Sequence, residues 1–152
     1  MKVIFLDIDG VLNSSQSAIF HNQNEKEFDS QFEMLCPIAI ALLRHAIEDT
    51  NAKVVISSTW RKYQSHEDLS NFFKKHNIEV VGFTKVLDKT RGYEIKEWLC
   101  RHPKVKDFII LDDDKDMEDL TDTDHFVHIN HHTGLNFFDM QKIINKFNKK
   151  SS

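Results

Sequence analysis

Five short apolar runs, separated by segments of helical character, constrain the fold of this chain more than any other feature. Several of the runs are continuous and rich in β-branched residues, which is typical of strands covered on both faces. They span residues 3–8, 53–57, 78–83, 108–112 and 126–129. Apolar residues recur with helical spacing over residues 37–49, 66–77, 92–102 and 136–147. This alternation predicts an α/β domain.

The order of these segments predicts a Rossmann-like, doubly wound sheet of five mostly parallel strands, with helices on both faces. The 152 residues suit a single domain, which we expect over residues 1–150. The segments between the strands are too short for a separate cap domain. Residues 14–36 are polar and weakly periodic, and we expect there a loop that acts as a lid or a binding loop.

Composition narrows the class of protein. The formal net charge of −4 gives no overall attraction to nucleic acid or to an anionic membrane. The apolar start of the chain meets Asp7 before a signal peptide could form, and no run approaches the ~20 apolar residues of a membrane span. Cys36 and Cys100 have no metal-binding or redox spacing. We therefore expect a cytoplasmic protein with no membrane partner.

Carboxylate or hydroxyl side chains follow three of the predicted strands. In parallel α/β sheets, ligands bind at the carboxyl ends of the strands, so these side chains are expected to converge there. Neighbouring carboxylates repel one another and are costly to bury unless a cation intervenes. Oxygen ligands at this density suit Mg²⁺, which completes its coordination with water and substrate phosphate. The residues at the three strand ends are Asp7, Asp9, Ser57, Ser58, Asp112 and Asp113.

Three motifs resemble those of the haloacid dehalogenase (HAD) superfamily, whose members are mostly Mg²⁺-dependent phosphohydrolases. DIDGVLN at residues 7–13 resembles the first motif, VVISS at 54–58 the second, and FIILDDD at 108–114 the fourth, and they occur in the family's order. SSTWR, RGYEIKEWL, LDDDKDM and TGLN further resemble a bacterial branch that includes HAD domains attached to RNA-repair proteins.

The resemblance implies a role for each motif residue. Asp7 would be the nucleophile that forms an aspartyl-phosphate, and Asp9 would be the general acid and base. Mg²⁺ would be held by a carboxylate oxygen of Asp7, the backbone carbonyl of Asp9, and Asp112 or Asp113. Ser57 would hydrogen-bond a phosphoryl oxygen. These roles agree with the chemistry, because phosphoryl transfer depends mostly on positioning and charge neutralisation.

The third motif is the point of departure from the family, which usually has a lysine there to neutralise the nucleophile and the phosphate. The candidates in this chain are Lys85, Lys89 and Arg91. We favour Arg91, whose planar guanidinium suits phosphate oxygens, with Lys89 as the second choice.

Four residues near the presumed site have less specific signals. Asn13, Ser58 and Arg61 adjoin motif residues and are candidates for contact with substrate, although Asn13 and Arg61 suit a structural role equally well. Trp60 is more often a packing residue, but an exposed aromatic ring at this position would stack on a base.

The histidines of HFVHINHH do not match a metal-ligand pattern, and we interpret them as ordinary strand and loop residues. Their positions are His125, His128, His131 and His132.

Two other classes of protein remain as alternatives. A response-regulator receiver domain also carries an acidic pair, an acceptor aspartate and a hydroxyl, but in another order along the chain. A catalytically inactive HAD fold would serve as a binding module. Within the enzyme class, the absence of a cap predicts an open site, which admits a nucleic-acid end or another large phosphorylated substrate. A small phosphate ester also fits if an oligomeric partner closes the site, and the sequence does not define the oligomeric state.

Overall fold

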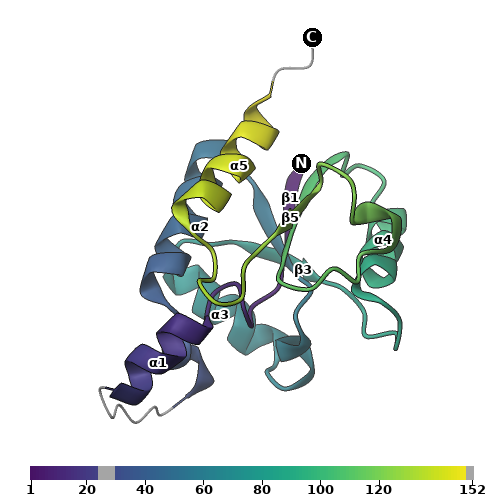
Figure 1. The fold of residues 1–152 in the computed structure, drawn as a ribbon. Coiled ribbons are helices and arrows are strands. Elements are labelled where there is room, and N and C mark those ends of the chain that lie inside the picture. The colour runs from purple at the N-terminus through teal and green to yellow at the C-terminus, as the bar shows by residue number, and fades with distance from the viewer. Residues whose placement is uncertain (24–29, 150–152) are drawn as a thin grey trace.

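The computed structural model of the protein describes residues 1–23 and 30–149 (Figure 1). It confirms the predicted α/β fold. The strands are β1 (Lys2–Leu6), β2 (Lys53–Ile56), β3 (Val80–Phe83), β4 (Asp107–Asp112) and β5 (Phe126–His128). The α-helices are α1 (Ser15–Gln23), α2 (Pro37–Thr50), α3 (His66–Lys75), α4 (Arg91–Arg101) and α5 (Phe137–Asn148). The described residues also form three 3₁₀ turns: η1 (Gln31–Met34), η2 (Thr59–Lys62) and η3 (Glu118–Leu120).

All five strands are parallel and lie in the order β3-β2-β1-β4-β5. The chain therefore winds outward from β1 in one direction through β2 and β3, and then in the other direction through β4 and β5. Leu6, at the end of β1, pairs with Ile56 of β2 and with Leu111 of β4. The order reverses between β1 and β4, and in open α/β sheets ligands bind at the carboxyl ends of the strands beside such a reversal.

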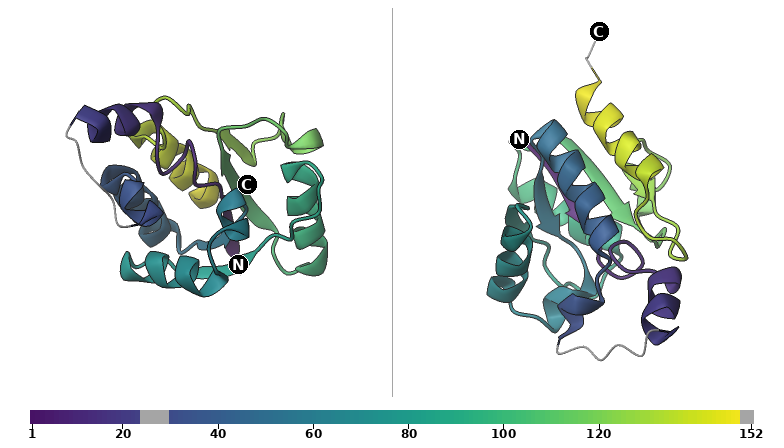
Figure 2. Two further views of the ribbon diagram at one scale, coloured as in Figure 1. Left: turned by 90° about the horizontal axis from the view of Figure 1, so that it is seen from below. Right: turned by 90° about the vertical axis from the view of Figure 1, so that its left-hand side faces the viewer.

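The helices cover both faces of the sheet (Figures 1 and 2). Buried residues of α2, α3 and α5 pack with Ile4, Leu6 and Ile56 on one face. On the other face, Ile95 and Trp98 of α4 pack on Phe5 and its neighbours. Alternate residues of the central strand thus point into two separate cores, which explains why its apolar run is continuous.

The predicted loop over residues 14–36 is wrong for part of its length. Ser15–Gln23 forms helix α1, and Gln31–Met34 forms η1. The Ser14 hydroxyl accepts a hydrogen bond from the Ser17 backbone N–H at 3.1 Å, which caps the start of α1. Residues 24–29 of this segment, and residue 150 at the predicted end of the domain, lie outside the described residues.

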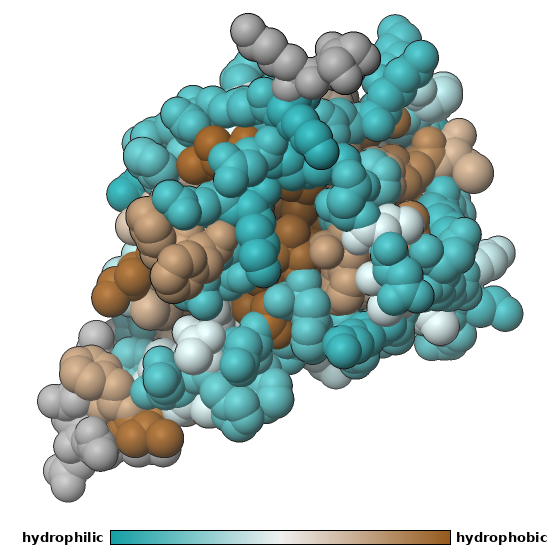
Figure 3. Space-filling model, turned by 45° about the horizontal axis from the view of Figure 1, so that its top comes forward, coloured by the Kyte–Doolittle hydropathy of each residue, from teal (hydrophilic) through white to brown (hydrophobic). Residues whose placement is uncertain are grey.

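Helix α1 extends beyond the carboxyl end of the sheet (Figures 1 and 2). Its Ile19 and Phe20 are exposed, as are Ile38 at the start of α2 and Phe137 and Phe138 at the start of α5. Apolar side chains gather at the lower left of Figure 3, where α1 lies beside the grey atoms. None of the helices over the described residues has the length and apolar character that crossing a bilayer requires.

Candidate active site

Asp7 lies where the chain leaves β1, between the two strands that flank it. Its backbone N–H donates to the carbonyl of Leu111 at 3.0 Å, which continues the pairing with β4 beyond Leu6. Its side chain is buried, with 7% of the residue's surface exposed, whereas Asp9 is exposed. The two predicted catalytic carboxylates therefore have different surroundings although they are only one residue apart.

Gly10 permits the turn that follows. Its φ of +80° lies in the left-handed region that disfavours side chains. A β-carbon at this position would also clash with the Asp113 carboxylate. The glycine thus allows the first motif to approach the end of β4 closely.

Asp7, Asp112 and Asp113 form an acidic cluster, the one group among the described residues whose side chains converge closely enough to hold a metal ion. Each offers one oxygen, and the three oxygens lie within 4.8 Å of one another. Asp7 and Asp112 are buried and Asp113 is half-buried. Converging carboxylate oxygens are ligands that suit a hard divalent cation such as Mg²⁺. Asp9 is not a side-chain member of the cluster, and its predicted carbonyl ligand stays a prediction.

Burial raises the pKa of Asp7 well above its usual range, and the charge of Asp112 raises it further. Burial likewise raises the pKa of Asp112, to about 7. Both carboxylates therefore hold protons readily when no cation is present, and a bound cation would favour their ionised forms. The pKa values thus agree with the geometry of a metal site.

Arg91 is the third-motif candidate that the structure brings to the acidic cluster. Its positive charge lowers the pKa of both Asp7 and Asp112. One guanidinium nitrogen, Nη1, is buried and lacks a hydrogen-bond partner within the described part of the chain. In contrast, Lys85 is exposed and lies 3.7 Å from Glu97, and Lys89 is exposed over the ring of Tyr93.

Ser57 directly follows β2. Its N–H donates to the carbonyl of Leu6 at 3.0 Å, so its position follows from the pairing of β1 with β2. The side chain is fully buried, and its hydroxyl has no hydrogen-bond partner within the described residues. A buried hydroxyl without a partner is costly, which makes it a donor available to a ligand oxygen.

Two of the predicted substrate contacts have structural partners. The Ser58 hydroxyl accepts from the Trp60 N–H at 3.2 Å and caps η2. Arg61 is buried and forms an ion pair with Glu94, between Nη2 and Oε1, at 2.8 Å. Its Nη1 donates to the carbonyls of Ser57 and Ser58 at 2.8 and 2.7 Å. In this arrangement Arg61 supports the turn that presents Ser57, and the sequence reasoning had missed its partner Glu94.

Asp9 is held by two neighbours. The Asn13 side chain donates to Asp9 Oδ1 at 2.9 Å, and its own Oδ1 accepts from the Gly10 N–H at 2.8 Å. The Trp60 indole N–H also donates to Asp9 Oδ1, at 2.9 Å. The predicted substrate contact Asn13 thus lies against the first motif itself, and Trp60 is a buried residue that touches the site.

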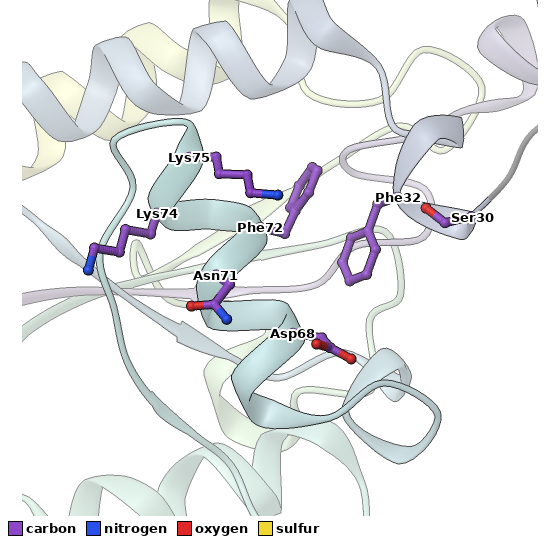
Figure 4. Close-up of a pocket in the computed structure, with 7 residues that line it drawn as sticks. All are labelled: Ser30, Phe32, Asp68, Asn71, Phe72, Lys74 and Lys75. Atoms are coloured by element: carbon purple, nitrogen blue, oxygen red, sulfur yellow. The ribbon is translucent and has the colours of Figure 1, made fainter.

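A hollow of about 640 Å³ lies between η1 and α3. Phe32 of η1 and Phe72 of α3 stack in its wall with ring centroids 4.7 Å apart (Figure 4). The Phe32 ring also meets the Trp60 ring edge-on at 5.5 Å. The hollow is lined by Ser30, Phe32, Asp68, Asn71, Phe72, Lys74 and Lys75.

Two residues of the histidine-rich segment, His125 and His128, contact backbone carbonyls of β4 and of the loop that follows it. His128 Nε2 lies 2.8 Å from the carbonyl oxygen of Asp113, and because a carbonyl only accepts, this nitrogen carries the proton. His125 Nδ1 lies 2.9 Å from the carbonyl of Phe108 in the same way. No histidine joins a metal-binding group among the described residues.

A Rossmann-like sheet with an aspartate after β1, a serine after β2 and paired aspartates after β4 is the architecture of a HAD-type domain. The chain belongs to the family described as the HAD domain in Swiss Army Knife RNA repair proteins, whose model matches residues 3–139. The comparisons with curated proteins and with solved structures returned no match. The membership confirms the resemblance seen in the sequence and indicates a hydrolase of the phosphatase type rather than a receiver domain.

Proposed function

We propose that the protein is a Mg²⁺-dependent phosphatase that cleaves phosphoric monoesters through an aspartyl-phosphate intermediate. The observation that carries the proposal is the cluster of Asp7, Asp112 and Asp113, whose oxygens lie within 4.8 Å of one another at the carboxyl ends of β1 and β4. The Ser57 hydroxyl and Arg91 Nη1, which have no hydrogen-bond partner among the described residues, would provide donors for the phosphoryl oxygens beside it.

In the first step, a carboxylate oxygen of Asp7 attacks phosphorus, and the bond from phosphorus to the ester oxygen breaks. Asp9 gives its proton to that oxygen, so the alcohol leaves neutral. Arg91 and Ser57 hold the phosphoryl oxygens in place. Mg²⁺, bound by Asp7, Asp112 or Asp113 and the Asp9 carbonyl, would neutralise the charge between nucleophile and phosphate.

In the second step, Asp9 takes a proton from water, and the water oxygen attacks phosphorus. The bond between phosphorus and the Asp7 oxygen breaks, which releases inorganic phosphate and restores the Asp7 carboxylate. Asp9 is then protonated again and ready for the next substrate. One carboxyl group thus works as acid and then as base, which suits its exposure to solvent.

The family and the open architecture support a large phosphorylated substrate, such as a nucleic-acid end. Only α1, η1 and α2 lie between β1 and β2 in the described residues, and only η2 and α3 lie between β2 and β3. Over the residues that the structure describes, neither interval contains a folded cap that would close the site around a small molecule. Whether residues 14–36 act as a lid stays a prediction.

Release of phosphate from 4-nitrophenyl phosphate tests the proposal. We expect turnover with Mg²⁺, none with a chelator, none with Asp7→Asn, and a loss of about 10²-fold or more with Asp9→Asn. Asp107→Asn at the opposite end of β4 is the matched control and should keep full activity. Turnover that survives Asp7→Asn would refute the nucleophile, and a folded wild-type protein without turnover would favour the inactive binding module.

The substrate class needs a second experiment. Oligonucleotides with 5′- or 3′-phosphates are compared with a panel of phosphorylated metabolites under the same conditions. We expect higher kcat/KM for the oligonucleotides, because the site is not enclosed. Higher values for a metabolite would instead support a small substrate.

A further inference from the structure

Trp60 is a core residue that contacts Asp9, the general acid of the proposed reaction. The residue is buried, with 7% of its surface exposed, yet its indole N–H reaches the exposed Asp9. The distance from Nε1 to Asp9 Oδ1 is 2.9 Å. Trp60 lies in η2, directly after the serines that end β2. A buried indole that donates to an exposed carboxylate holds this carboxylate at a fixed place.

Asp9 Oδ1 accepts a second hydrogen bond, from Asn13 Nδ2, also at 2.9 Å. A carboxylate oxygen has about two lone-pair directions, so two N–H donors occupy Oδ1. The other oxygen, Oδ2, is then the atom on which a proton can be carried. Because both donors lie on one oxygen, rotation of the carboxyl group that exchanges Oδ1 and Oδ2 would break two hydrogen bonds.

We propose that Trp60 is a positioning residue, which together with Asn13 orients the Asp9 carboxyl group so that Oδ2 gives and takes the proton. The proposal rests on the proposed phosphatase function and adds to it a residue outside the acidic cluster. Trp60 does not touch the phosphate in this scheme and acts only through Asp9.

A hydrogen bond and two aromatic contacts hold the indole in the orientation that this role needs. The Trp60 backbone N–H is tied to the Ser58 hydroxyl at 3.2 Å. The Phe32 ring packs edge-on against the indole, at 5.5 Å and 68°. Phe32 is in turn stacked on Phe72 of α3, as Figure 4 shows. Aromatic pairs of this kind each contribute about 0.5–1.5 kcal/mol beyond the burial of area.

The test compares substrates whose leaving groups need a proton to different degrees. An alkyl phosphate has a poor leaving group and depends on the general acid, whereas 4-nitrophenolate leaves without a proton. In Trp60→Phe we expect kcat/KM to fall about 10- to 100-fold for the alkyl phosphate and about threefold or less for 4-nitrophenyl phosphate. Replacement of Trp60 by 3-benzothienylalanine removes the N–H but keeps the ring shape, and should give the same pattern without loss of packing.

Trp98→Phe is the matched control. Trp98 is the other tryptophan of the chain, is also buried, and packs against Phe5 on the opposite face of the sheet. This variant should leave the ratio of the two kcat/KM values unchanged. Equal losses for both substrates in the Trp60 variants, or no loss for either, would overturn the proposal, because a purely structural role does not distinguish leaving groups.

A measurement without turnover separates this proposal from the proposed function. The two indole N–H groups give two NMR signals, and Asp9→Ala should move the Trp60 signal and leave that of Trp98 in place. If the Trp60 signal does not move in Asp9→Ala while the wild-type protein is an active phosphatase, the positioning role alone is refuted. A wild-type protein without activity on either substrate refutes the phosphatase function and the role of Trp60 with it.

Discussion

The ion pair between Arg61 and Glu94 is buried, and its burial determines how much free energy of unfolding we expect a substitution of Glu94 to cost. Their side chains are only 2% and 6% exposed, and Arg61 Nη2 lies 2.8 Å from Glu94 Oε1. The other Glu94 oxygen accepts from the Leu87 N–H at 2.8 Å. Burial lowers the pKa of Arg61, the charge of Arg91 lowers it further, and Glu94 opposes both. Without Glu94, two neighbouring guanidinium groups would lack this compensation.

The perturbation is Glu94→Gln, which keeps the shape of the side chain and removes its charge. Breaking a buried pair on one side costs about 3–5 kcal/mol of the free energy of unfolding. We expect the lower end, about 3 kcal/mol, because the amide oxygen still accepts one hydrogen bond. For a domain of this size the melting temperature should fall by roughly 6–12 °C. Denaturant unfolding, followed by tryptophan fluorescence, measures the loss directly if the m-value is unchanged.

Glu79→Gln is the control for this measurement. Glu79 pairs with Lys53 at the surface, with side chains 63% and 32% exposed. Exposed pairs contribute about 0–1 kcal/mol, so this variant should unfold almost at the wild-type midpoint. If Glu94→Gln cost no more than Glu79→Gln, burial of the pair would not determine its contribution, and the reasoning would be refuted.

Two further predictions concern the acidic cluster. Burial raises the pKa of Asp112 to about 7. The folded metal-free protein therefore binds more protons than the unfolded chain between about pH 4 and pH 7. Its free energy of unfolding falls as the pH rises through that window. Added Mg²⁺ should therefore raise the melting temperature more at about pH 8 than at about pH 6, and an equal rise at both would contradict the assignment. Gly10→Ala would push against Asp113 and should weaken Mg²⁺ binding in calorimetry about tenfold or more. Gly134→Ala has similar backbone strain, at a φ of +71°, and should lower stability without changing Mg²⁺ affinity.

The fold could be predicted from the sequence because its strongest signals are local. Continuous β-branched runs predicted strands with two covered faces, and all five are present with small differences at their ends. The last predicted helical segment begins at Asn136, and in the structure Asn136 forms a capping box with Asp139 at the start of α5. The doubly wound arrangement followed from general rules of α/β proteins, whereas the order of the strands was not predicted.

Helix α1 could not be predicted, because it has no apolar face that repeats with helical spacing. Its sequence, SQSAIFHNQ, leaves Ile19 and Phe20 exposed rather than buried. Periodicity detects helices that pack on a core, and α1 does not pack in that way. The hydroxyl pair of Ser14 and Ser17 was the available local signal, but such pairs also occur in turns.

The acidic cluster could be predicted from the residues at the strand ends, whereas the side-chain contacts around the cluster could not be predicted from the sequence. Asp7, Asp112 and Asp113 converge because β1 and β4 are neighbours. The partner of Arg61 is 33 residues away in the chain, and that of Trp60 is 51 residues away. Side-chain pairs at such separations depend on rotamers and on the packing between elements, which a single sequence does not reveal.

The pairing of β1 with β4 sets an order of events during synthesis of the protein. Asp7 is synthesised before its two carboxylate neighbours, which lie at and just after the end of β4. The acidic cluster therefore does not exist in the growing chain until β4 has paired with β1. If the cluster holds Mg²⁺ as proposed, the ion would bind only after this pairing and would not stabilise an unfinished chain.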